Sequence, residues 1–77
     1  MRGDEFVRYR ILFKDKVDKS VLREVKERHN GDVEGISELY DLLIENGTCD
    51  SDTVSRIYYV AYTLSLKGIE MIIVKLD

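Results

Sequence analysis

The alternation of apolar and polar residues predicts one strand near each end of the chain. Residues 6–14, FVRYRILFK, alternate between apolar and largely basic side chains, and a period of two is typical of a half-buried strand. Residues 69–76, IEMIIVKL, carry apolar side chains on both faces, which favours a strand buried on both sides. The sequence therefore predicts a two-stranded sheet, with parallel strands if each intervening helix reverses the chain.

Two amphipathic helices are predicted after the first strand. Residues 19–29 place apolar side chains on one stripe, with Asp18 as the N-cap. Residues 33–45 repeat the helical spacing, with Asp32 as the N-cap and Asn46-Gly47 as the stop signal. Both helices are short and have one polar face, so each is expected to cover one side of a small core.

The third predicted helix contains the most apolar segment, IYYVAYTLSL at residues 57–66. Its start is marked by DSDT at residues 50–53 and its end by Lys67 and Gly68. A helix that is apolar on nearly every side needs cover on nearly every side. A single small domain supplies only part of that cover. We therefore expect a homodimer, although the helix could instead form the centre of a monomer core; the expected interface residues are Tyr59, Tyr62, Thr63 and Leu66.

These elements predict one domain over residues 1–77, of the α+β class, with the order β-α-α-α-β. The two-stranded sheet would pack on a layer of three helices. Because isolated sheet edges invite further pairing, the sheet could extend across the dimer.

Cysteine usage and hydropathy predict the compartment. Cys49 is the only cysteine, so no intramolecular disulfide can form. The longest uncharged run is far shorter than the roughly 20 residues that a membrane span needs. Together with the lack of a signal-peptide pattern, these features predict a cytoplasmic protein with no membrane association.

The charges are divided unevenly along the chain. Residues 1–30 contain nine Lys/Arg and six Asp/Glu, a net charge of +3, whereas residues 31–77 contain three and nine, a net charge of −6. The second helix carries a row of acids opposite its apolar face, namely Glu34, Glu38, Asp41 and Glu45. Such a row favours binding to a protein partner with a basic surface, although an ordinary solvated helix face has the same pattern.

The first strand suggests an alternative function, because its polar face carries Arg8, Arg10 and Lys14. Strand-helix-helix over residues 6–46 resembles the ribbon-helix-helix repressors, in which paired strands of a dimer enter the major groove of DNA. The resemblance rests on the element order and two arginines, and residues 50–77 have no counterpart. It implies that Arg8 and Arg10 would contact guanine edges. Alternatively, the basic face is simply the solvent side of an edge strand.

No arrangement in the sequence predicts catalysis, a metal or a cofactor. Cys49 and His29 are the candidate nucleophile and base, and nothing in the sequence brings them together. The alternating polar residues at 46–52 have the spacing of a calcium loop but lack its glycine and its final glutamate. We therefore expect a small non-enzymatic regulator, an inhibitor or adaptor that binds a protein, with a dimeric DNA-binding regulator as the alternative.

Overall fold

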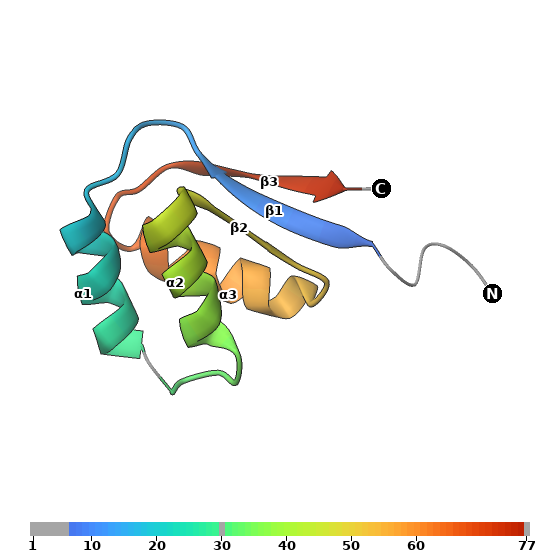
Figure 1. The fold of residues 1–77 in the computed structure, drawn as a ribbon, viewed down its shortest axis with the longest axis horizontal. Helices are drawn as coiled ribbons and strands as arrows, with labels where there is room; N and C mark the ends of the chain where they lie inside the picture. The colour runs from blue at the N-terminus through green and yellow to red at the C-terminus, as the bar shows by residue number, and fades with distance from the viewer. Residues whose placement is uncertain (1–6, 30, 77) are drawn as a thin grey trace.

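Three helices and three strands make up the part of the chain that the structure describes. The computed structural model describes residues 7–29 and 31–76. The elements are β1 (Arg8–Phe13), α1 (Lys19–His29), α2 (Ile36–Asn46), β2 (Thr48–Ser51), α3 (Val54–Ser65) and β3 (Met71–Leu76) (Figure 1). The α+β class is confirmed, and the order is β-α-α-β-α-β.

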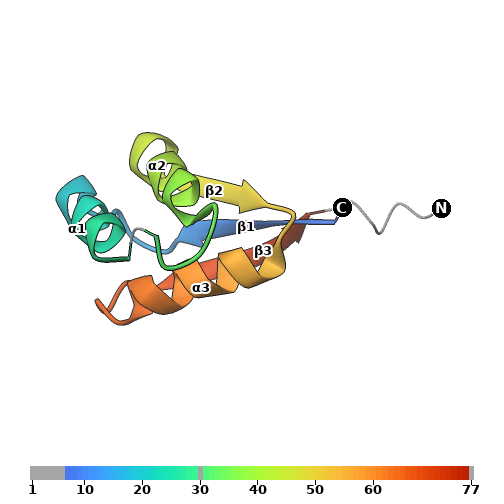
Figure 2. The same ribbon diagram turned by 90° about the horizontal axis from the view of Figure 1, so that it is seen from below.

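The strands form one antiparallel sheet with the order β2-β1-β3. β1 is the central strand, and its registers run from Tyr9↔Ser51 to Leu12↔Thr48 with β2 and from Arg8↔Leu76 to Phe13↔Met71 with β3. Figures 1 and 2 show the helices α1, α2 and α3 on one side of this sheet. In the described part of the chain, the other side of the sheet has no helix over it.

The core lies between the sheet and the helices. Ile11 of β1 is completely buried, and its sheet neighbours on either side are Cys49 and Ile73. The alternation along β1 sends Ile11 inward and Leu12 outward, where Leu12 is 39% exposed. The helices complete the core with Leu22, Val25, Ile36, Leu39, Tyr40, Leu43, Ile57, Val60 and Leu64.

The β2 strand is absent from the sequence-based prediction, which assigned residues 50–53 to a helix start. Residues 48–51 alternate like a strand, with Cys49 and Ser51 buried and the other two partly exposed. The Thr48 hydroxyl donates to the Ile11 carbonyl at 2.6 Å and thereby adds a side-chain bond to the β1–β2 ladder. A polar four-residue strand gives too weak a pattern to outweigh the helix-start signal.

The predicted pairing of the two terminal strands is confirmed, but the predicted parallel direction is wrong. β1 and β3 run antiparallel. The prediction assumed that only three helices reverse the chain between these strands, whereas β2 adds one more reversal. β2 and β3 then lie on opposite sides of β1, and α3 connects them.

The helix ends agree with the sequence signals at two places and differ at a third. The Ser20 N–H donates to Asp18 Oδ1 at 2.9 Å at the start of α1, and the Gly47 N–H donates to the Leu43 carbonyl at the end of α2. However, α2 begins at Ile36 instead of residue 33, after Gly35 in the left-handed region with φ of 82°. Asp32 is therefore not the N-cap of α2.

Candidate functional site

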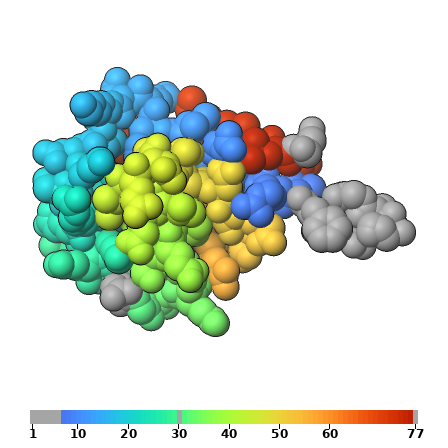
Figure 3. All heavy atoms as spheres, in the orientation of Figure 1, coloured from blue at the N-terminus to red at the C-terminus, as the bar shows by residue number. Residues whose placement is uncertain are grey.

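The exposed side of α2 carries acids around a leucine. Glu38, Asp41 and Glu45 are exposed, and Leu42 between them is 38% exposed. Each of these four residues lies three or four positions from two of the others, so they share one side of the helix. We call Glu38, Asp41, Leu42 and Glu45 the acidic α2 surface. In Figure 3, α2, coloured yellow-green, occupies the middle of the visible face.

Part of this charge is neutralised within the chain. Lys26 of α1 donates to Asp41 Oδ1 at 2.5 Å. No ion pair of Glu38 or Glu45 occurs within residues 7–29 and 31–76. The fourth predicted acid, Glu34, is exposed but precedes α2 in the turn before Gly35. The structure thus brings three of the four predicted acids onto one helix side and leaves two of them without an intramolecular ion pair among the described residues.

The predicted basic face of β1 lies on the outer side of the sheet, and its central residue, Arg10, already forms an ion pair within the chain. Arg10 donates two hydrogen bonds to the carboxylate of Asp50 on β2, at 2.7 and 2.9 Å. These bonds lower the pKa of Asp50 from its ordinary value. Arg8 and Lys14 are exposed. A guanidinium held through Nε and Nη2 in this way has to give up an ion pair before it can contact a base.

The resemblance to the ribbon-helix-helix repressors does not extend to the pairing of the first strand. In those repressors the strand pairs with the same strand of a second copy. Here β2 and β3 occupy both edges of β1. A central strand has no free edge, so β1 cannot form an intermolecular ribbon while this fold persists.

The exposed side of α3 differs from the expected interface set. Tyr62 and Leu66 are 60% and 63% exposed, and their part in an interface stays a prediction. Thr63 is 1% exposed and donates to the Val60 carbonyl, so its side chain does not reach the surface of the single chain. Tyr59 is half-buried, and its hydroxyl donates to Asp32 Oδ2 at 2.6 Å. The difference arises because a helix turns by about 100° per residue, so neighbours of an exposed position face the core.

Two residues on α3 outside the expected interface set are also exposed. Val54 is 40% exposed and Tyr58 is 57% exposed. With Tyr62 and Leu66 they recur at every fourth position and form one stripe along the helix. This spacing was visible in the sequence, but the apolar residues all round the helix concealed which stripe faces solvent.

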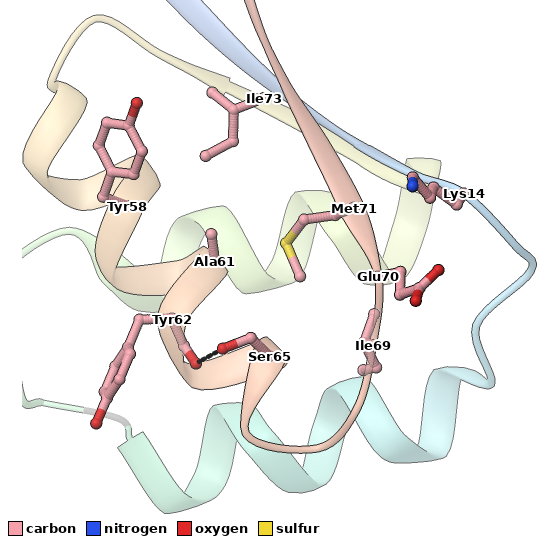
Figure 4. Close-up of a pocket in the computed structure, with 9 residues that line it drawn as sticks. All are labelled: Lys14, Tyr58, Ala61, Tyr62, Ser65, Ile69, Glu70, Met71 and Ile73. Carbon is pink, nitrogen blue, oxygen red and sulfur yellow. Dashed lines mark hydrogen bonds between the residues drawn. The ribbon is translucent and has the colours of Figure 1, made fainter.

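An open groove separates α3 from β3. It has a volume of about 570 Å³. Figure 4 shows Met71 and Ile73 of β3 pointing toward α3, with Tyr58 and Ala61 opposite them. The groove, called here the α3–β3 groove, is lined by Lys14, Tyr58, Ala61, Tyr62, Ser65, Ile69, Glu70, Met71 and Ile73.

The groups considered for catalysis lie apart from this groove. Cys49 is 2% exposed, and burial raises the pKa of its thiol to about 12, so the reactive thiolate is scarce near neutral pH. His29 lies 3.1 Å from Asp32 through Nδ1, beside the Tyr59 hydroxyl. The hydrogen bonds from Tyr59 and His29 lower the pKa of Asp32. This cluster joins the end of α1 to α3, and it does not include Cys49.

The described residues contain neither a cluster placed to hold a metal ion nor a helix suited to crossing a membrane. No group of three or more His, Cys, Asp or Glu side chains there is placed to hold a metal ion. None of the helices in residues 7–29 and 31–76 has the length and apolar character that a membrane crossing needs.

Comparisons with known proteins add no family. No protein-family model matches the chain, no curated protein matches it, and no solved structure matches it. The proposals below therefore rest on the residues and their geometry.

Proposed function

We propose that the protein is not an enzyme and that it acts, as an adaptor or inhibitor, by binding another protein through the acidic α2 surface. The observation that carries this proposal is the position of Leu42. It is 38% exposed between Glu38 and Glu45, which have no intramolecular ion pair in the described part of the chain. An apolar centre inside a charged rim is the usual anatomy of a protein-binding surface.

The charges define the complementary partner. Glu38 and Glu45 lie on the same helix side as Asp41, and only Asp41 is neutralised by Lys26. A partner that places Lys or Arg side chains around an apolar pocket would relieve the repulsion between these carboxylates and cover Leu42. Rim charges of this kind mainly accelerate association and exclude wrong partners, whereas the apolar centre contributes most of the affinity.

The geometry favours this surface over a DNA-binding face. Arg10 is held by Asp50, and β1 has no free edge. The acidic α2 surface repels phosphate, and the chain has a pI of about 5.1. A protein partner therefore fits the exposed charges of this chain better than a nucleic acid does.

Reversing two charges on α2 should weaken partner binding. The wild-type protein, immobilised and incubated with lysate of cells that naturally express it, should capture a basic protein whose purified form binds more weakly as salt rises. Glu38→Lys combined with Glu45→Lys should weaken this binding roughly 10- to 100-fold, because attractions at the rim become repulsions. Titration calorimetry or fluorescence anisotropy would measure the change.

A matched control has the same change in net charge. Glu70→Lys combined with Asp52→Lys alters two exposed acids that lie outside α2. Each pair also contains one acid close to a helix N-terminus, so the effects on helix stability are comparable. The control should bind within about twofold of the wild type. Equal loss of binding in both variants would refute a specific role for α2.

A further inference from the structure

β3 has a row of backbone groups that faces away from the sheet. The Lys14 N–H donates to the Glu70 carbonyl at 3.2 Å, and this pair continues the β1–β3 register by one residue. Hydrogen-bonded and non-hydrogen-bonded pairs alternate along an antiparallel ladder. The residues of β3 that bond to β1 are therefore Ile72, Val74 and Leu76. The residues that direct their N–H and C=O groups outward are Met71, Ile73 and Lys75.

No strand pairs with this outer side of β3 within residues 7–29 and 31–76. An unpaired edge is a template for another strand, and proteins commonly block such edges with charges, prolines or bulges. Here the outward row contains one charge, Lys75, next to the end of the strand. The middle of the edge, at Ile73, is not blocked.

The outward row is complementary to itself in one antiparallel register. A twofold axis through Ile73 places Ile73 opposite Ile73 of a second copy and Met71 opposite Lys75 in both directions. All three outward-facing residues then form hydrogen-bonded pairs, about six backbone bonds in total. An axis through Ile72 or Val74 would match one of these residues with a position outside β3. An axis through Lys75 would place two positive charges opposite each other, which is unfavourable.

The side chains beneath the strand favour the same arrangement. α3 packs chiefly against β1 and β2, so it leaves the inner side of β3 half-covered over the α3–β3 groove. Edge pairing through β3 would bring two such grooves together under the joined strands, with Tyr58 and Tyr62 of each copy along them. Charge does not oppose this approach, because the charged side chains that line the groove among the described residues are Lys14 and Glu70, which have opposite signs and lie at one end (Figure 4).

We propose that a second copy of this chain is the occupant of this edge, forming a twofold dimer through β3 and α3 with a continuous six-stranded sheet. A standard interface needs roughly 800 Å² from each partner. Tyr58 and Tyr62 are 57% and 60% exposed, and covering them alone supplies on the order of 200–300 Å². The β3 edge, Leu66 and the groove walls extend this apolar surface on both sides.

The dimer surface and the acidic α2 surface are separate. α2 packs on β2, at the opposite edge of the sheet from the free edge of β3. A dimer formed through β3 would therefore carry two acidic α2 surfaces at its two ends. The dimer proposal does not depend on the proposed partner binding, and either can fail without the other.

Sedimentation equilibrium of the full chain and three variants tests the dimer. The wild type should sediment at about 18 kDa, twice the chain mass of 9.0 kDa, at tens of micromolar. Ile73→Lys places like charges opposite each other at the axis and should give 9 kDa, with a dissociation constant raised at least 100-fold. Tyr62→Lys changes a residue that is 60% exposed, so the monomer should fold and should also dimerise at least 10-fold more weakly. Leu12→Lys, an equivalent change on the outer side of β1, should remain a dimer.

Three outcomes would overturn the proposal. The first is a wild-type protein that sediments at 9 kDa at 100 µM. The second is a dimer that persists in folded Ile73→Lys. The third applies if circular dichroism shows that Ile73→Lys does not fold. It is a Tyr62→Lys variant that dimerises as tightly as the wild type.

Discussion

Ile11→Ala is expected to lower the free energy of unfolding by about 3–4 kcal/mol, roughly a quarter or more of the stability of a chain of this length. Ile11 is completely buried at the centre of the middle strand, so truncation removes apolar contacts to both the sheet and the helices and leaves a cavity. A chain of this length has a total stability of roughly 4–12 kcal/mol. Urea denaturation followed by circular dichroism measures the change as a shift of the midpoint at constant slope.

Leu12→Ala is the matched control for Ile11→Ala. Leu12 is the next residue of the same strand, but its side chain lies on the outer side of the sheet and is 39% exposed. We expect it to cost less than about 1 kcal/mol, because little buried contact is lost. Equal destabilisation by the two substitutions would contradict the assignment of one covered and one open sheet face.

Thr63→Val should destabilise the fold by about 1–3 kcal/mol without affecting dimerisation. The completely buried Tyr40 hydroxyl is hydrogen-bonded to Thr63 Oγ1, and the Thr63 hydroxyl donates to the Val60 carbonyl. Valine has nearly the same shape, but it leaves the Tyr40 hydroxyl buried without an acceptor. Thermal or chemical denaturation, together with sedimentation, would measure both effects.

Replacing the other partner of this hydrogen bond, alone and together with Thr63, tests whether the unpaired Tyr40 hydroxyl causes the loss of stability. Tyr40→Phe should cost less, about 0.5–1.5 kcal/mol, because Thr63 still has the Val60 carbonyl as its acceptor. Combining Tyr40→Phe with Thr63→Val should cost less than the sum of the single changes, since Tyr40→Phe removes the hydroxyl that Thr63→Val leaves unpaired. Strict additivity would show that the hydrogen bond contributes nothing.

Hydrophobic periodicity predicted the long elements but not the short one. The strands at 8–13 and 71–76 and the helix at 19–29 follow from clear patterns of period two and 3.6. β2 did not follow, because its four residues are polar or small and its stability comes from partners distant in sequence. Arg10 and Ile11 supply those partners, and no local pattern reveals them. The missed strand also caused the error in strand direction.

The candidate surfaces were predictable in part. The acidic row on α2 is a local pattern, and its members at 38, 41 and 45 do share one side of the helix. The pairing of Asp41 with Lys26 and of Arg10 with Asp50 depends on packing between elements, so the sequence could not show which charges are neutralised. Likewise, the stripe of α3 that faces solvent is set by how α3 sits on β1 and β2.

Amide hydrogen exchange of wild-type β3, followed by NMR at two protein concentrations, tests the central claim most directly. In the proposed dimer, two copies pair along the outer edge of this strand. The N–H groups of Ile72, Val74 and Leu76 should be protected at every concentration, because they bond to β1. Those of Met71, Ile73 and Lys75 should be protected at high concentration and should lose this protection on dilution. Exchange of Met71, Ile73 and Lys75 at the rate of an unstructured peptide at 1 mM, while the alternate residues stay protected, would contradict the account.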